Sequence, residues 1–156
     1  MTESSSITES CSMSPSSTSV SSSADRFCHA IGAATLRTAD AFCPDVILDA
    51  TVPNWHFVRR GRDVVRDQPS YWFADPGRFD SLRRTPLPDG ELVEFELGWV
   101  EDGVPHVCRQ VHVLELRDER IARDTVWCGR RWPASLLADM EEAQRAVDRV
   151  PDVVGG

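Results

Sequence analysis

Residues 104–132, VPHVCRQVHVLELRDERIARDTVWCGRRW, decide the fold of this chain. Two long segments of alternating residues, rich in β-branched and aromatic side chains, flank a short turn at Asp118-Glu119-Arg120. Residues of this kind in this alternation are typical of β-strands. The stretch therefore predicts a long antiparallel hairpin.

One face of this hairpin mixes polar with apolar side chains. It carries, from the two strands in turn, His106, Cys108, Gln110, His112, Leu114, Leu116, Ala122, Asp124, Val126 and Cys128. The opposite face carries Val107, Arg109, Val111, Val113, Glu115, Ile121, Arg123, Thr125 and Trp127. Because neither face is wholly apolar or wholly polar, we expect a curved sheet that wraps around a polar-lined but sheltered pocket.

Three further strands are predicted upstream of the hairpin. Residues 91–101 alternate, and their apolar face consists of Val93, Phe95, Leu97 and Trp99. Asp102-Gly103 then forms the hairpin turn that leads into residue 104. Residues 81–86 are a predicted short strand, and residues 45–52 are a longer one that ends at Pro53-Asn54.

Helical segments surround these strands. The first is expected from Asp25, with Ser23 as its N-cap, to Pro44, since apolar residues recur there at helical spacing. The second follows Gly61 and is expected to be split into two short helices by Pro69. The last begins with Pro133 in its first turn. Its apolar stripe consists of Leu136, Met140, Ala143 and Val147.

This order of elements predicts an α+β domain in which a bent sheet packs against helices on one face. The 156 residues suffice for one domain with a core. Residues 1–23 are mostly Ser and Thr, and they are expected to be a disordered tail because they cannot bury enough apolar surface. The α+β domain is expected over residues 24–150, and residues 151–156 are expected to fray.

Composition narrows the classes of partner. The formal net charge is −8, and every basic residue except the histidines is Arg. An acidic protein repels phosphate backbones and anionic membrane surfaces, so we expect neither nucleic acid nor membrane as a partner. The chain has no apolar run of about 18 residues and no secretory signal at its start, which favours a cytoplasmic location.

The cysteine and histidine pattern predicts no metal site. The five cysteines contain no CxxC pair and fit no zinc spacing, so reduced thiols are expected. His106, Cys108, His112 and Cys128 share a face, but they spread over too great a length of strand for tetrahedral closure. Cys128 has no adjacent base that would make it a nucleophile, so a buried thiol is expected there.

Four segments together resemble the nuclear transport factor 2-like superfamily, and more narrowly its SnoaL-like branch. They are FCPDVILDATV (42–52), the helix after Gly61, VEFELGW (93–99) and QVHVLELRDERIARDTVW (110–127). The resemblance covers about residues 25–132. It implies a cone-shaped curved antiparallel sheet packed on N-terminal helices, followed by a C-terminal helix, and a homodimer. The superfamily includes isomerases, cyclases, epoxide hydrolases, dehydratases and non-catalytic binding proteins, so the fold alone does not give the activity.

The catalytic carboxylates of two enzymes in this superfamily are missing here. The base of ketosteroid isomerase falls at Ala50, and its oxyanion-binding aspartate falls at His112. The Arg and two Asp residues of limonene epoxide hydrolase fall at Leu97, Trp99 and Val126. The resemblance therefore argues against either of these two chemistries.

Asp124 and His112 are the candidate catalytic pair, because a tight turn places them on the same face. A histidine beside a carboxylate can move a proton near neutral pH, and isomerisation, cyclisation or dehydration needs only such a group and a dry pocket. The first hypothesis is thus a SnoaL-like enzyme that acts without a cofactor on an apolar cyclic or polyketide-like substrate. The alternative role for the pair is a hydrogen-bonded filling of a polar gap in the core.

A second set of residues is expected to shape the ligand pocket. It consists of Trp55, His56, Tyr71, Trp72, Leu97, Trp99, Gln110, Val126 and Cys128. For His56 and its aromatic neighbours, closure of the barrel end is the alternative, and for Tyr71 it is simple packing on the sheet. Arg130-Arg131 is either a solvated turn or an anion contact at a dimer seam.

Two other hypotheses remain open from the sequence. The same cone can serve as a non-catalytic small-molecule-binding or dimerisation module, which the missing carboxylates favour. It can also present an apolar outer face to another chain, and Val107, Val111 and Val113 would supply such a patch.

Overall fold

The computed structural model describes residues 21–149. Residues 1–20 of the predicted tail 1–23, and the whole of the predicted tail 151–156, lie outside this range. The elements in chain order are α1 (Ser23–Gly32), the 3₁₀ helix η1 (Leu36–Thr38), β1 (Phe42–Val52), β2 (Trp55–Arg60), α2 (Arg62–Trp72), β3 (Gly77–Leu87), β4 (Gly90–Glu101), β5 (Val104–Arg117), β6 (Arg120–Pro133) and α3 (Ala134–Asp148). The α+β class is confirmed.

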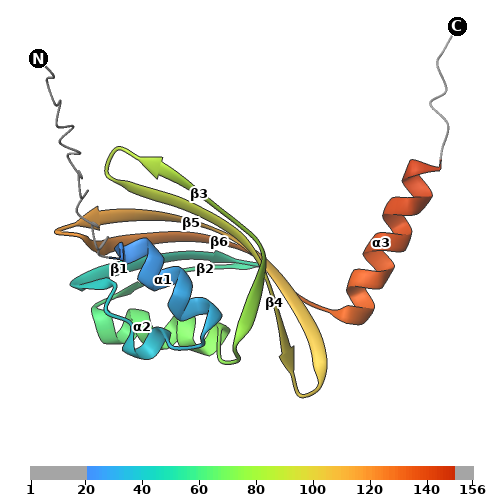
Figure 1. The fold of residues 1–156 in the computed structure, drawn as a ribbon, viewed down its shortest axis with the longest axis horizontal. Helices are drawn as coiled ribbons and strands as arrows, with labels where there is room; N and C mark the ends of the chain where they lie inside the picture. The colour runs from blue at the N-terminus through green and yellow to red at the C-terminus, as the bar shows by residue number, and fades with distance from the viewer. Residues whose placement is uncertain (1–20, 150–156) are drawn as a thin grey trace, which may run out of the picture.

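Six strands form one curved sheet in the order β2-β1-β6-β5-β4-β3. All neighbouring strands are antiparallel except β1 and β6, which are parallel, so the sheet is mixed rather than purely antiparallel. Figure 1 shows α1 and α2 together on one side of the sheet, with α3 apart from both. This arrangement is the open cone that the sequence predicted.

The core lies between the sheet and α1. Alternate residues of β1, β4, β5 and β6 are buried there: Val46, Leu48, Ala50, Val93, Phe95, Leu97, Cys108, Leu114, Val126. From α1, Phe27 and Ile31 are fully buried against them. The predicted inward face of the central hairpin is confirmed, with one exception. Ile121 is buried as well, because the pairing of β5 with β6 shifts between Glu115 and Leu116.

The N-terminal helix is shorter than predicted. Ser22, not Ser23, is its N-cap: the Asp25 amide donates to Ser22 Oγ (3.1 Å), and the Ser22 amide donates to Asp25 Oδ2 (2.8 Å). The helix ends at Gly32 because Ala34 adopts a left-handed φ of 57°. Phe42 therefore belongs to β1, which also contains Pro44 at an irregularity in its pairing with β6.

The second helix is longer than predicted. Pro69 was expected to split it, but α2 is one continuous helix over residues 62–72, and Pro69 is buried within it. Pro69 stands in the last turn, where the missing amide costs a single intrahelical bond. Pro69 is buried, and α2 as a whole packs against η1 and β1.

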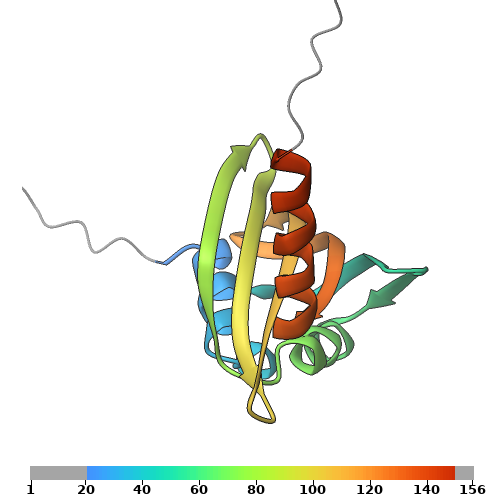
Figure 2. The ribbon, with the colours of Figure 1, turned by 90° about the vertical axis from the view of Figure 1, so that its right-hand side faces the viewer.

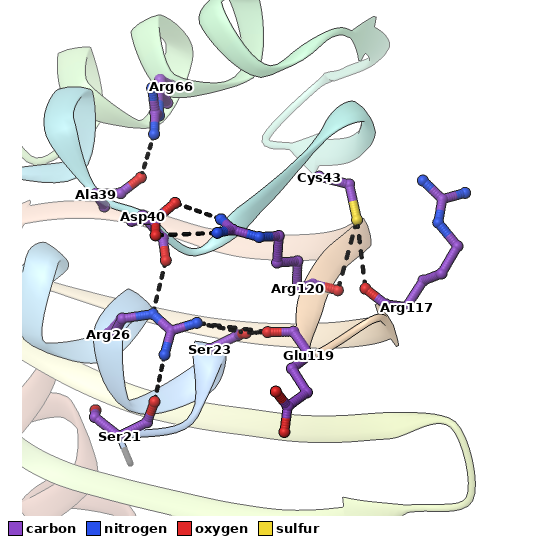
Figure 3. Close-up of polar contacts among 10 residues, drawn as sticks. All are labelled: Ser21, Ser23, Arg26, Ala39, Asp40, Cys43, Arg66, Arg117, Glu119 and Arg120. Carbon is purple, nitrogen blue, oxygen red and sulfur yellow. Dashed lines mark hydrogen bonds and ion pairs between the residues drawn. The ribbon is translucent and has the colours of Figure 1, made fainter.

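The start of α1 is tied to the β5–β6 turn, as Figure 3 shows. Ser23 Oγ donates to the carbonyl of Glu119, and Arg26 Nε donates to the carbonyl of Asp40 (2.7 Å). Arg120 forms an ion pair with Asp40. These contacts fix the end of the central hairpin against the helix layer, so the inner face of β5 and β6 is closed at this end.

The C-terminal helix packs on very little of the molecule. Its main contacts within the described part of the chain are with β5 and β6, and none of its residues is buried. Figure 2, viewed from the side of α3, shows this helix in front of the strands. The predicted Glu141–Arg145 pair forms at 3.7 Å. Leu136, Met140 and Val147 of the predicted apolar stripe are exposed.

Candidate functional site

An aromatic cavity of about 340 Å³ lies at the end of the cone away from the Glu119 turn. Its lining is mostly apolar and aromatic: Val52, Pro53, Phe57, Trp72, Phe73, Trp99, Cys108, Gln110, Cys128, Arg130, Arg131. The lining comes from β1, β2, α2, β4, β5 and β6. Curvature of the sheet and the position of α2 thus bring together residues that are far apart in the sequence.

A β-bulge shapes the rim of this cavity. Gln110 pairs with Cys128, but Cys108 pairs with Arg131, so β6 contains one more residue than β5 between these pairs. Arg130 adopts a φ of 99°, which a residue with a side chain rarely takes. In a regular strand Arg130 and Arg131 would point to opposite faces, whereas here both line the cavity.

The predicted pair of His112 and Asp124 is formed. His112 Nδ1 lies 2.8 Å from Asp124 Oδ1, and His112 Nε2 lies 3.0 Å from Gln110 Oε1. Gln110 lines the cavity, whereas His112 and Asp124 do not. The chain Gln110–His112–Asp124 therefore runs from the cavity wall into the core.

Aromatic rings hold the imidazole in place. Phe95 is stacked on His112 with centroids 5.5 Å apart, and Phe27 meets it edge-on at 5.2 Å. The imidazole is buried by these contacts, and Asp124 Oδ2 has no hydrogen-bond partner among residues 21–149. A buried carboxylate oxygen without a partner is costly, which makes this pair an unusual feature of the core.

Gln110 connects the pair with Cys128 at the cavity wall. In the observed orientation its Nε2 donates to Cys128 Sγ (3.4 Å). Its Oε1 then accepts a hydrogen bond from His112 Nε2. A flipped amide would instead donate to His112 Nε2 and accept from the Cys128 thiol. Both orientations satisfy the Gln110 amide.

The thiol at the inner wall is unreactive. Burial raises the pKa of Cys108 to about 12, with a smaller contribution from the neighbouring Cys128. Burial likewise raises the pKa of Cys28, on the buried face of α1, to about 11. Since a thiolate is the nucleophilic form, neither residue has nucleophilic character near neutral pH.

The predicted pocket residues fall into three groups. Trp72, Trp99, Gln110 and Cys128 line the cavity. Leu97 and Val126 are fully buried in the core below it. Trp55, His56 and Tyr71 are exposed and do not line it. Contact of the last five residues with a ligand stays a prediction.

His56 was expected at the cavity, but it contacts Asp49 instead. Its Nε2 lies 2.7 Å from Asp49 Oδ1, and Asp49 also pairs with Arg123. The hydrogen bond from His56 is the main reason that the pKa of Asp49 is lowered. This network lies on the outer face of β1, β2 and β6, away from the aromatic cavity.

Sequence reasoning missed several residues of the wall. Phe57 and Phe73 directly follow the predicted residues His56 and Trp72, so these aromatic clusters are the signal that could have found them. Val52 is the last residue of β1, and Pro53 follows it in the turn before β2. The side on which Arg130 lies could not be found from the sequence, because it depends on the bulge.

Among residues 21–149, no group of His, Cys, Asp and Glu side chains has the arrangement of a metal site. Within the same range, no helix is long and apolar enough to cross a membrane.

No protein-family model matches the chain, and neither does any curated protein sequence. Solved structures do match. A nuclear transport factor 2-like protein from Anabaena variabilis gives a TM-score of 0.58 at 16% identity, over 69% of this chain and 84% of that one. A second, from Mesorhizobium loti, gives 0.56 at 20% identity, over 69% and 88%.

A third match is a hypothetical protein from Catenulispora acidiphila with a ketosteroid isomerase-like fold, solved in complex with trimethylamine. It gives a TM-score of 0.52 at 17% identity, over 74% of this chain and 89% of that one. These matches define the class of protein: the chain has the nuclear transport factor 2-like fold.

Proposed function

We propose that this protein is a SnoaL-like binder of a small, largely apolar molecule, such as a cyclic or polyketide-like compound. One observation carries the proposal: four aromatic side chains, Phe57, Trp72, Phe73 and Trp99, converge on one cavity of about 340 Å³. This volume and this lining are typical of small-molecule sites. Aromatic walls favour a flat ligand, because rings gain from stacking in addition to their buried area.

The burial of His112 and Asp124 favours binding over catalysis. A ligand in the cavity meets the Gln110 amide before it meets the imidazole. An amide fixes the orientation of a polar group on the ligand by hydrogen bonding, but it is a poor proton carrier. The solved complex with trimethylamine from Catenulispora acidiphila is an example of small-ligand binding in this fold.

Titration with 1-naphthamide, a neutral bicyclic probe, tests the binding function. Isothermal titration calorimetry should detect binding, and the fluorescence of Trp72 and Trp99 in the cavity wall should change with it. Cys128→Phe places a ring in the cavity and should abolish both signals. Val58→Phe is the control, because Val58 is 40% exposed on β2 and does not line the cavity. Equal binding by both variants would place the probe elsewhere and contradict the proposal.

The second candidate function is cofactor-free acid/base chemistry by His112 and Asp124. The observation in its favour is the buried Asp124 carboxylate, one oxygen of which has no partner among the described residues. Its other oxygen contacts the His112 imidazole, and Gln110 separates this imidazole from the cavity. Functional sites tolerate such costly arrangements. For this chemistry the substrate must displace the Gln110 side chain and reach His112 Nε2.

Deuterium exchange into 2-tetralone, an apolar bicyclic ketone, tests this candidate. In D₂O the enzyme should accelerate exchange at the carbon next to the carbonyl, and Asp124→Asn should abolish the acceleration while the circular dichroism spectrum stays unchanged. Asp49→Asn is the matched control outside the cavity. Exchange at the buffer rate with the parent protein would remove the acid/base candidate and leave the binding function standing.

We also propose that the protein forms a homodimer. Leu136, Met140 and Val147 of α3 are exposed, and no described residue covers them. The outer sheet face offers Trp127, which is 48% exposed. Val107, Val111 and Val113 of this face are half-buried and contribute less apolar surface. A second copy of the chain would cover both surfaces.

Light scattering after size exclusion tests the dimer. The parent protein should have twice the mass of the chain, and Met140→Glu should shift it toward the mass of one chain. Ala138→Glu is the control, because Ala138 lies on the side of α3 away from the stripe. A single-chain mass for the parent protein would contradict the proposal.

A further inference from the structure

Two arginines stand at the rim of an otherwise uncharged cavity. Among the residues that the structure describes, Arg130 and Arg131 are the only charged ones in its lining, and the rest of the wall is aromatic, aliphatic, thiol or amide. A positive rim around an apolar interior is a composition that the binding function alone does not require. These two side chains would therefore contact a particular group of the ligand at the rim.

The charge of Arg131 is already balanced, and that of Arg130 is not. Arg131 forms an ion pair with Glu101, and its guanidinium lies 5.1 Å from the centre of the Trp99 ring. The Arg130 side chain makes no hydrogen bond or ion pair with any residue in the range 21–149, and Arg130 is exposed at the rim. The rim thus carries one positive charge without a partner among the described residues, beside an aromatic wall.

The backbone at Arg130 is arranged at a cost. A φ of 99° is accessible to Gly and unfavourable for Arg, although Gly129 is its direct neighbour. The bulge that produces this φ is also what places Arg130 and Arg131 on the same side of β6. Strained residues of this kind concentrate at ligand-binding sites.

We propose that this rim selects ligands with one anionic group, such as a carboxylate, on an apolar cyclic body. This inference rests on the proposed binding function and names the class of ligand. Arg130 would hold the anionic group at the rim by a charge-assisted hydrogen bond. The apolar body would lie between Trp72, Phe73 and Trp99, and the Gln110 amide at the inner wall would meet a neutral polar group.

Paired probes of equal shape test the inference. 1-Naphthoate and 1-naphthamide differ in charge and share the same bicyclic body. Calorimetry should give about tenfold or more tighter binding of the naphthoate, as a hydrogen bond to a charged group predicts. Equal affinities would overturn the anion inference and leave the binding function intact. If neither probe binds, both proposals fall.

Three variants test whether the rim arginines cause the preference for naphthoate over naphthamide. Arg130→Gln should bring the affinity for naphthoate down to that for naphthamide, which itself should change little. Arg60→Gln should leave both affinities unchanged: Arg60 is exposed at the end of β2 away from the cavity and has no ion-pair partner among the described residues. Glu101→Gln should strengthen the preference for naphthoate, since it frees the charge of Arg131.

Arg130→Gly separates function from fold. Glycine adopts a φ of 99° readily, so this variant should melt at the same temperature as the parent protein or higher. It should nevertheless lose the preference for naphthoate. A retained preference in Arg130→Gly and Arg130→Gln would show that the rim does not select the anion.

Discussion

His112 Nδ1 lies 2.8 Å from Asp124 Oδ1, and the two side chains are only 2% and 1% exposed. A pair buried this deeply is worth little when intact, because desolvation offsets its attraction. Removal of one partner is costly, because it leaves the other without compensation. The core of this protein is therefore sensitive to changes at either residue, whatever chemistry the pair performs.

Asp124→Ala should lower the free energy of unfolding by about 3–5 kcal/mol. Asp124→Asn keeps an acceptor for the imidazole and should cost about 1–3 kcal/mol. Urea denaturation measures both values. In a double-mutant cycle with His112→Ala, a coupling energy of about 1–3 kcal/mol is expected, since the residues are in direct contact. Additive effects would mean that the two side chains do not stabilise each other.

Acid sensitivity is expected from the contact between α1 and the β3–β4 hairpin. The hydrogen bond from Arg84 is the main reason that the pKa of Asp25 is lowered below 3.8, and the Ser22 amide adds to the effect. A lowered folded-state pKa gives stability that is present above pH 3.8 and is lost as the pH falls through the folded value.

Asp25→Asn should therefore be less stable than the parent protein at pH 6, and the difference should shrink as the pH falls below 3.8. Urea denaturation at a series of pH values measures this difference. Asp63→Asn is the control, since Asp63 is exposed in the first turn of α2 and has no ion-pair partner among the described residues. A difference that persists unchanged at the lowest pH would exclude the Arg84 contact as its source.

Periodicity of the sequence predicted most of the sheet. Val93, Phe95 and Leu97 alternate with charged or small residues, and all three are buried as expected. Alternation works here because one face of each strand meets the core and the other meets solvent. The same rule placed Asp124 and His112 on one face, and the structure brings them into contact.

Local exceptions to this periodicity were not predictable. The left-handed φ of Ala34 ends α1, although an alanine there continues the helical pattern. Pro69 was expected to break α2, but its place in the last turn makes it tolerable. In both cases tertiary packing decides between conformations that differ locally by about 1–3 kcal/mol.

The candidate site depends on long-range geometry even more strongly. Trp72 and Trp99 were expected at the cavity and line it, whereas Trp55 was also expected there and is exposed. The three are chemically alike, and only the curvature of the sheet distinguishes them. The role of Arg130 follows from a bulge of one residue, which no alternation pattern reveals.

The thiols at and near the cavity should differ in reactivity. Burial raises the pKa of Cys108 to about 12, so its thiolate is scarce at pH 8, whereas Cys128 is half-buried at the cavity wall. Iodoacetamide at pH 8 should modify Cys128 well before Cys108, as peptide mass spectrometry can follow. Bound 1-naphthoate should slow the modification of Cys128. Faster labelling of Cys108 would mean that this thiol is not buried as the structure shows.

Backbone contact at the β3–β4 turn makes Gly90 a sensitive position. A β-carbon at Gly90 would lie 1.8 Å from the carbonyl oxygen of Leu114, a backbone atom of β5 that cannot move without breaking the sheet. Gly90→Ala should therefore cost about 3 kcal/mol or more, or prevent folding. Gly32→Ala is the matched control: its β-carbon would meet the Phe79 ring at 3.4 Å, and alanine favours the helix. Thermal unfolding should show Gly32→Ala as stable as the parent protein or more so. A Gly90→Ala protein of parental stability would mean that β4 and β5 are not paired in this register.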